Sequence, residues 1–304
     1  MGGMLLLLLI SLPFIGTAAS SIVYVNPSSA GTVGGVSFTE SDILAFDSND
    51  NTWSPYFTGS ALGVTEEING FHVLATGEIL LTFNNATSVP GVGTVPPSDI
   101  VKFNPIPGLF ERIFDGSDVG LSDESENIDA LAMLSNGNLI ISTTGAVSVV
   151  GVSGADEDLL EFAVTSLGNN TSGAFSIFFD GSDVGLTDEN VEGVWLAPFT
   201  NDIYLSLGDV FLVGGGCVDA SDILAFTGSS GPATSGTLSL FWDGPANGYP
   251  AQNMNGFSLS GNNLVPPSAP GRCESIPVSP QGGYILMAIF LLGIGGLSLK
   301  YRLN

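Results

Sequence analysis

Apolar and polar positions alternate along most of this chain in short runs that are separated by Gly, Asn, Asp and Ser. One run recurs with a fixed pattern: a small polar or acidic residue, Asp, a branched aliphatic residue, two variable residues and Phe. Its four copies are residues 41–46, 98–103, 157–162 and 221–226. The Asp residues of successive copies lie 57, 59 and 64 positions apart. A period of this length indicates a repeated supersecondary unit.

Three further elements recur in the same order around each copy. Each copy of the repeated run is followed by an apolar run that ends in an aromatic pair or its equivalent. An Asp-Gly turn or its equivalent comes next. Then come a short segment that starts with an aliphatic residue or Met, and an alternating apolar run. The short segments are 68–71, 128–131, 191–194 and 254–257, and the alternating runs are 78–83, 138–143 and 202–207. Their β-branched and aromatic residues and near absence of Pro predict β-strands.

The phase of the repeat predicts how the chain closes. Turns at 76–77 and 136–137 join the short segment to the alternating run as a tight hairpin, so the short segment is the first strand of each unit. The chain opens at 22–25 on a second strand, and its last recognisable element, 254–260, is a lone first strand. We therefore predict an all-β, four-bladed β-propeller closed by its N- and C-terminal strands. An open β-solenoid or a sandwich is the alternative, but neither explains the matching ends.

Two stretches carry a resemblance to a known group of proteins. Phe114 to Leu121 and Phe179 to Leu186 both read Phe-Asp-Gly-Ser-Asp-Val-Gly-Leu. Residues 22–260 resemble the bacterial β-propeller repeat proteins that carry this motif, although the first and fourth copies, at 57–60 and 242–245, are degenerate. The resemblance implies a repeat scaffold, and a fold does not by itself imply a function.

Both ends of the chain predict export. The apolar stretch 4–15, followed by small residues, predicts a secretory signal peptide over 1–20, although no Lys or Arg precedes it. The propeller then spans 21–260 and a Pro-rich linker spans 261–275. A C-terminal segment over 276–304 contains an apolar run, 284–299, that ends in Lys and Arg. We expect this run to form a transmembrane helix with its basic end in the cytoplasm.

The C-terminal segment resembles the bacterial IPTL-type sorting signal. It has Ile276-Pro277, an apolar helix and a basic end, but Val278 and Ser279 replace the usual Thr and Leu. The resemblance implies export, followed by processing or retention by a sorting enzyme in a Gram-negative cell envelope. An ordinary C-terminal membrane anchor is the alternative.

Composition narrows the range of partners. The formal net charge of the 304-residue chain is -25, with only five Lys and Arg residues. Because nucleic-acid binding requires basic side chains on the phosphates, we exclude nucleic acid as a partner. Two cysteines, Cys217 and Cys273, are candidates for a disulfide in an oxidising compartment, and two free thiols are the alternative.

The sequence holds no recognisable catalytic set. It lacks a nucleophile elbow, a phosphate-binding loop with Lys and a zinc motif. The only histidine, His72, is expected to be structural because no other histidine accompanies it. The acidic loop that starts at Asp115 has a spacing similar to that of a calcium loop, but we interpret it as an Asp-Gly turn between strands.

One set of oxygen-bearing residues follows from the predicted fold. These residues occupy the same position at the start of the innermost strand of each blade: Asn69, Asp129, Glu192 and Asn255. If they surround one mouth of the central channel, they would suit Ca²⁺, Na⁺ or ordered water. Two of the four are carboxylates, which repel each other in the absence of a cation. We therefore predict a candidate cation site at the channel mouth.

These features favour an exported, envelope-associated interaction module that is not an enzyme and that binds an unknown protein or glycan. One alternative is a carbohydrate-active enzyme, a lyase or a glycosidase, which needs two carboxylates at a set separation. The other alternative is a structural component of a surface layer or matrix.

Overall fold

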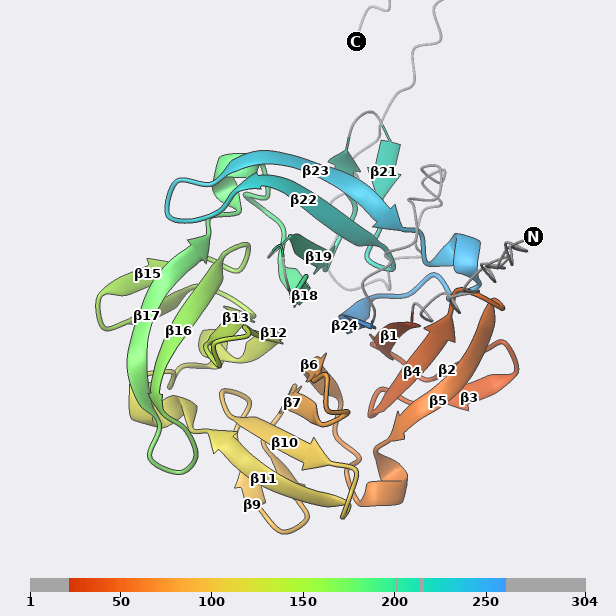
Figure 1. Cartoon of the computed structure of the whole chain (residues 1–304), viewed down its shortest axis with the longest axis horizontal. Helices are drawn as coiled ribbons and strands as arrows, with labels where there is room; N and C mark the ends of the chain where they lie inside the picture. The colour runs from red at the N-terminus through yellow and green to blue at the C-terminus, as the bar shows by residue number, and fades with distance from the viewer. Residues whose placement is uncertain (1–21, 199, 201, 214–215, 261–304) are drawn as a thin grey trace, which may run out of the picture. The chain divides into compact units, whose positions relative to one another are not determined.

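A computed structural model describes residues 22–198, 200, 202–213 and 216–260 of the chain. These residues form four antiparallel four-stranded sheets that surround a central axis (Figure 1). The prediction of an all-β, four-bladed β-propeller is confirmed. The predicted signal peptide, the linker over 261–275 and the C-terminal segment over 276–304 lie outside the described residues. Among the described residues, no helix combines the length and the apolar composition that a membrane span requires.

The four blades share one arrangement, in which the first strand named lies nearest the axis. Blade 1 contains β24 (Met254–Ser260), β1 (Ile22–Pro27), β4 (Asp42–Asp47) and β5 (Thr52–Thr58). Blade 2 contains β6 (Ile68–Val73), β7 (Ile79–Phe83), β10 (Ile100–Asn104) and β11 (Leu109–Phe114). Blade 3 contains β12 (Ile128–Met133), β13 (Leu139–Thr143), β16 (Leu159–Ser166) and β17 (Ser172–Phe179). Blade 4 contains β18 (Val191–Leu196), β19 (Ile203–Leu207), β22 (Ile223–Ser229) and β23 (Ser235–Trp242).

Short elements that the sequence pattern did not predict connect these strands. A small hairpin follows the second strand of each blade: β2–β3 (Gly31–Val33, Val36–Phe38), β8–β9 (Thr87–Val89, Gly93–Val95), β14–β15 (Val147–Val149, Val152–Gly154) and β20–β21 (Phe211–Val213, Gly216–Val218). Single 3₁₀ turns follow the fourth strands: η1 (Ser60–Leu62), η2 (Gly116–Val119), η4 (Ser182–Val184) and η5 (Pro245–Asn247), with η3 (Glu124–Glu126) before β12. Each hairpin strand has only three residues, too few for a hydrophobic period to be visible in the sequence.

The two ends of the described chain meet in blade 1, as predicted. β1 pairs antiparallel with β24 from Ile22 opposite Ser260 to Asn26 opposite Gly256. An aromatic cluster joins blades 4 and 1 beside this pairing. The Trp53 and Tyr249 ring centroids lie 5.9 Å apart, and Trp53 Nε1 donates a hydrogen bond to the Asn247 carbonyl over 3.0 Å. Strand pairing and side-chain packing therefore both close the ring.

The Phe that ends each repeated phrase packs against the preceding blade. It lies in the third strand and meets the aromatic residue at or next to the end of the fourth strand of that preceding blade. The centroid distances are 5.3 Å for Phe57–Phe103, 5.2 Å for Phe114–Phe162, 5.0 Å for Phe179–Phe226 and 6.1 Å for Trp242–Phe46. All eight rings are buried. The two aromatic features of the repeat are therefore the two halves of one contact, formed at every blade interface.

The Asp of each repeated phrase fixes the turn that follows the fourth strand of its own blade. One carboxyl oxygen accepts a hydrogen bond from the backbone N–H of the turn glycine, over 2.9–3.0 Å, in Asp42, Asp99, Asp158 and Asp222. A Cβ on any of these four glycines would lie within 2.4 Å of the carbonyl oxygen that precedes the Asp. The turn therefore requires Gly, and the Asp of the repeated phrase holds that turn in place.

This arrangement predicts the effect of removing one Asp. Asp158 accepts from Gly181 N at 2.9 Å and from Ala155 N at 3.0 Å. We expect Asp158→Ala to lower the free energy of unfolding in urea by roughly 1.5–3 kcal/mol, because the N–H groups of buried Gly181 and partly buried Ala155 lose a charged acceptor. Asp183→Ala is the control: it removes the same charge from an exposed side chain and should change that free energy by less than about 0.5 kcal/mol. Equal effects of the two substitutions would contradict this role of Asp158.

Candidate functional site

The central channel has two chemically different mouths. The innermost strands β6, β12, β18 and β24 pack against one another around the axis. Residues at their starts line one cavity, and residues at their ends line another. We call these cavities the polar mouth and the apolar mouth.

The polar mouth brings together all four residues of the predicted cation site. This cavity has a volume of about 240 Å³. The described residues that line it are acidic residues, amides and one threonine: Glu67, Asn69, Asn84, Asp129, Thr144, Asn190, Glu192 and Asn255. The predicted residues therefore do surround a mouth of the channel. Glu67 and Asn190, each two residues before a predicted position, add a carboxylate and an amide to this lining.

A β-bulge places each of the four predicted residues. In β6, Ile68 pairs with Phe83 and Gly70 pairs with Thr82, so Asn69 has no partner in the ladder. The same one-residue shift leaves Asp129, Glu192 and Asn255 unpaired in the other innermost strands. A bulge redirects the side chain of its extra residue. The residue that follows is always Gly or Ala, and a Cβ on Gly70 would lie 2.6 Å from the Asp129 carbonyl oxygen.

Two asparagines of the polar mouth, Asn69 and Asn255, link neighbouring blades. Asn69 Nδ2 donates to the Ile128 carbonyl over 3.0 Å, and Asn255 Nδ2 donates to the Ile68 carbonyl over 3.2 Å. Asn255 Nδ2 also lies 2.6 Å from Glu67 Oε1. An ionised carboxylate has no N–H or O–H to donate. In blades 3 and 4, where Asp129 and Glu192 occupy this position, the hydrogen bond from the bulged side chain to the carbonyl of the next blade is therefore absent.

Asp129 has the least favourable surroundings of the four. Its side chain is only 2% exposed. Among the described residues, no well-aligned hydrogen bond reaches either carboxyl oxygen. Burial raises the pKa of Asp129 well above its usual value, the Glu192 charge raises it further, and the nearby Asn190 amide lowers it in part. Burial, followed by the charges of Glu67 and Asp209, raises the pKa of Glu192 to about 7.

The polar mouth is acidic but is not a preformed metal centre. No Lys, Arg or His is among the described residues that line it. Within the part of the chain that the structure describes, no three Asp, Glu, His or Cys side chains form a cluster with metal-ligand spacing. An ion held here would therefore keep part of its water shell.

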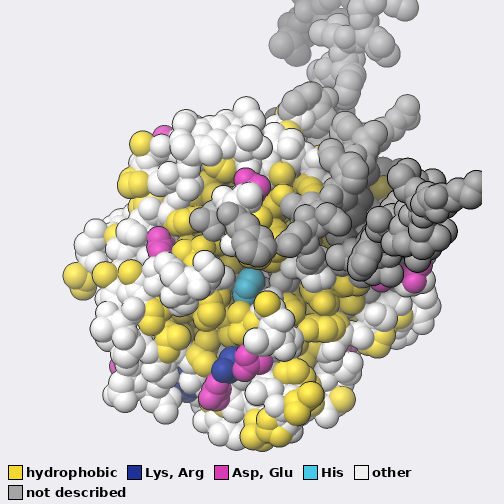
Figure 2. Space-filling model, viewed as in Figure 1, with side chains coloured by type: hydrophobic (Ala, Val, Ile, Leu, Met, Phe, Trp, Pro, Cys, Tyr) yellow, Lys and Arg dark blue, Asp and Glu magenta, His cyan; other side chains and the backbone are white. Residues whose placement is uncertain are grey.

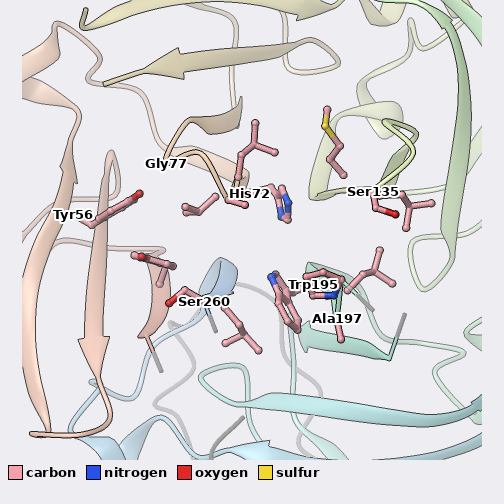
Figure 3. A pocket seen from close by; sticks show the side chains of 16 residues that line it. Tyr56, His72, Gly77, Ser135, Trp195, Ala197 and Ser260 are labelled. Atoms are coloured by element: carbon pink, nitrogen blue, oxygen red, sulfur yellow. The ribbon is translucent and has the colours of Figure 1, made fainter. Parts of the chain in front are cut away.

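The apolar mouth is the larger cavity, with a volume of about 690 Å³. Figure 3 shows side chains from several blades that point into it, and Figure 2 shows hydrophobic side chains gathered around the centre of this face. The residues at the ends of the innermost strands form much of the wall, including Leu74, Met133, Leu134, Leu196, Ala197 and Leu259. This cavity was not predicted, because apolar residues at strand ends resemble ordinary core positions in a sequence.

His72 lies in the wall of the apolar mouth (Figure 3). Its side chain is 7% exposed, and no described residue forms a hydrogen bond with Nδ1. Burial lowers the pKa of His72 to about 4. The imidazole is therefore neutral at pH 7 and contributes a polar atom to an otherwise mostly apolar surface.

Two other sequence expectations have different outcomes. The acidic loop beginning at Asp115 uses its carboxylates within the protein: Asp118 accepts from Thr171 N at 2.8 Å, and Glu126 accepts from Ser122 N, Asp123 N and Ser148 N. The interpretation as a turn between strands is confirmed. The Cys217–Cys273 disulfide stays a prediction, because Cys273 lies outside the described residues.

Comparisons with known proteins give weak likenesses. The sequence matches no family model and no curated protein. Among solved structures, a putative gluconolactonase has a TM-score of 0.35 at 13% identity, over 72% of this chain and 61% of that one. The structure of YCF48 bound to D1 peptide has a TM-score of 0.32 at 10% identity, and the alignment covers 71% of this chain and 51% of that one. Virginiamycin B lyase from Staphylococcus aureus has a TM-score of 0.31 at 10% identity, and the alignment covers 75% of this chain and 59% of that one. The aligned part of this chain thus spans about half to three fifths of each, and such likenesses carry no argument about function.

The chain's single histidine allows a direct test of the apolar mouth. The imidazole signals of His72 in an NMR titration should begin to shift only as the pH approaches about 4. Because the folded pKa lies below the unfolded value of about 6.5, only the unfolded chain takes up this proton between those values. The free energy of unfolding therefore loses up to about 3 kcal/mol from this group as the pH falls through that window. A midpoint near 6.5 would contradict the burial of His72.

Proposed function

We propose that the protein is an exported, envelope-associated β-propeller that binds a partner at its apolar mouth and catalyses no reaction. The observation that carries this proposal is the cavity of about 690 Å³ with a mostly apolar wall. Ligand sites in proteins are typically concave and mostly apolar, with a few polar groups, in this range of volume. The apolar runs at 4–15 and 284–299 support export, and the repeat motif supports kinship with bacterial β-propeller repeat proteins.

The chemistry of the wall favours a peptide over a glycan. Sugars present many hydroxyl groups, which need hydrogen-bonding partners when they are buried. The apolar mouth offers few such groups, chiefly Tyr24, Tyr56, His72, Ser135 and Ser260. An aliphatic or aromatic side chain of a protein partner would lose water-exposed apolar area in this cavity without leaving polar groups unpaired.

Charge indicates what surrounds that apolar side chain in the partner. No Asp or Glu is among the described residues lining the apolar mouth, yet the chain as a whole has a formal net charge of -25. Such a surface attracts basic partners and repels acidic ones. We therefore propose as the partner a peptide segment with one or two large apolar residues flanked by Lys or Arg.

An enzyme remains the second candidate because of the polar mouth. Asp129 and Glu192 bring two carboxyl groups with raised pKa values to one cavity, and groups of this kind occur at catalytic sites. The cavity of about 240 Å³ is smaller than most small-molecule sites, which favours the binding function.

Selection from a displayed random-peptide library tests the proposal, with affinities measured by fluorescence anisotropy. We expect enrichment of basic peptides with apolar anchors. Leu134→Glu and Ala197→Glu, in two different blades of the apolar mouth, should each weaken binding at least roughly tenfold, because a carboxylate would be desolvated by the apolar partner. The control Val150→Glu alters a side chain that is 95% exposed on a hairpin away from this mouth and should leave the affinity unchanged.

Three outcomes would contradict the proposal. Peptide binding that both mouth variants retain would mean that the partner uses another surface. Selective binding on a glycan array would replace the peptide with a sugar. Turnover in a panel of glycosidase and lyase substrates, abolished by Glu192→Gln, would identify an enzyme.

A further inference from the structure

The polar mouth contains more hydrogen-bond acceptors than donors. Four of its acceptor atoms are buried and accept no well-aligned hydrogen bond from the described residues: both carboxyl oxygens of Asp129, Oε2 of Glu192 and Oδ1 of Asn190. These three side chains come from blades 3 and 4 and from the loop that precedes β18. Buried acceptors without a partner are costly, so a group of them around one cavity indicates a missing donor or cation.

Three of the amide donors in the lining are already engaged, and the Asn190 amide lies near the Asp129 carboxyl group. Asn69 Nδ2 is bonded to the Ile128 carbonyl, and Asn255 Nδ2 is bonded to Glu67 and to the Ile68 carbonyl. Asn84 Nδ2 donates to the other Glu67 oxygen over 2.9 Å. A ligand entering the cavity therefore meets chiefly carboxylate and amide oxygens, which hard cations prefer.

Protonation of a carboxyl group would reduce this excess of acceptors over donors only in part. One proton on Asp129 supplies one donor, whereas the unpaired acceptors lie on three separate side chains. A hydrated cation compensates the carboxylate charge, and its water molecules supply donors to the remaining oxygens at the same time. The cavity of about 240 Å³ has room for an ion with several waters, each of which occupies roughly 30 Å³.

We infer that the polar mouth binds one partly hydrated calcium ion, with Asp129 and Glu192 as its charged ligands and the surrounding amide oxygens and water completing its shell. Calcium fits better than magnesium because it accepts irregular shells of six to eight oxygens, whereas magnesium demands a near-ideal octahedron. The inference goes beyond the proposed binding function and uses the opposite mouth. Because no tight cluster of ligands is present, we expect a dissociation constant on the order of 10⁻⁴–10⁻³ M.

Such an ion would connect the blades at the axis. Its two charged ligands are the bulged residues of β12 and β18, next to the bulged Asn69 and Asn255 of the other innermost strands. Because the site is assembled only when the blades surround the axis, calcium should bind the folded state alone and raise its melting temperature.

The test uses the protein after treatment with a chelator, with calorimetric titration and thermal melts in calcium chloride up to about 10 mM, a concentration well above the expected dissociation constant. We expect one ion per chain and a rise in melting temperature of roughly 3 °C or more. Magnesium chloride, and sodium chloride at matched ionic strength, control for screening of the large negative charge. The calcium-induced rise should exceed the rise in either control.

Matched variants identify the site. Asp129→Asn gives blade 3 the residue that blades 1 and 2 carry at this position, so it should fold, and it should weaken calcium binding at least roughly tenfold, as should Glu192→Gln. Glu124→Gln removes the same charge from an exposed residue and should leave binding unchanged. No calcium response in the wild type, or an equal response in Asp129→Asn, would overturn the inference.

Discussion

The ring depends on an aromatic contact that is repeated at each of its four blade interfaces. The Phe that ends the repeated phrase, in the third strand of one blade, meets the aromatic residue at or next to the end of the fourth strand of the preceding blade, with centroids 5.0–6.1 Å apart. The Asp that begins the same phrase fixes the turn after its own fourth strand. One six-residue phrase therefore holds the blade together at one end and attaches it to its neighbour at the other.

The two mouths of the channel follow from how the innermost strands surround the axis. A bulge near the start of each strand redirects an oxygen-bearing side chain to one end, whereas apolar residues line the other end. Gly70, Gly193 and Gly256, just past the bulges, have no side chain, and neighbouring atoms lie close to where their Cβ would be. The strands can therefore approach the axis closely, and the same scaffold presents an acidic cavity on one face and an apolar cavity on the other.

The sequence alone predicted the blade number, the pairing of the chain ends and four of the residues that line the polar mouth, because these follow from the phase of a repeat. It did not reveal that Asn69, Asp129, Glu192 and Asn255 are bulged, since a bulge is a property of strand register rather than of one strand's pattern. It also missed the apolar mouth, because Leu134 and Leu259 look like core residues until neighbouring blades show that they border a cavity. Glu67 and Asn190 were missed because they precede the strands in less regular segments.

The central claim, that the repeated phrase joins each blade to the next through its aromatic pair, is tested most directly by a double-mutant cycle at Phe179 and Phe226. Their centroids lie 5.0 Å apart at an interplanar angle of 84°, across the interface between blades 3 and 4. The free energies of unfolding of Phe179→Leu, Phe226→Leu and the double variant should give a coupling energy of about 0.5–1.5 kcal/mol. Strictly additive effects of the two substitutions would contradict the claim.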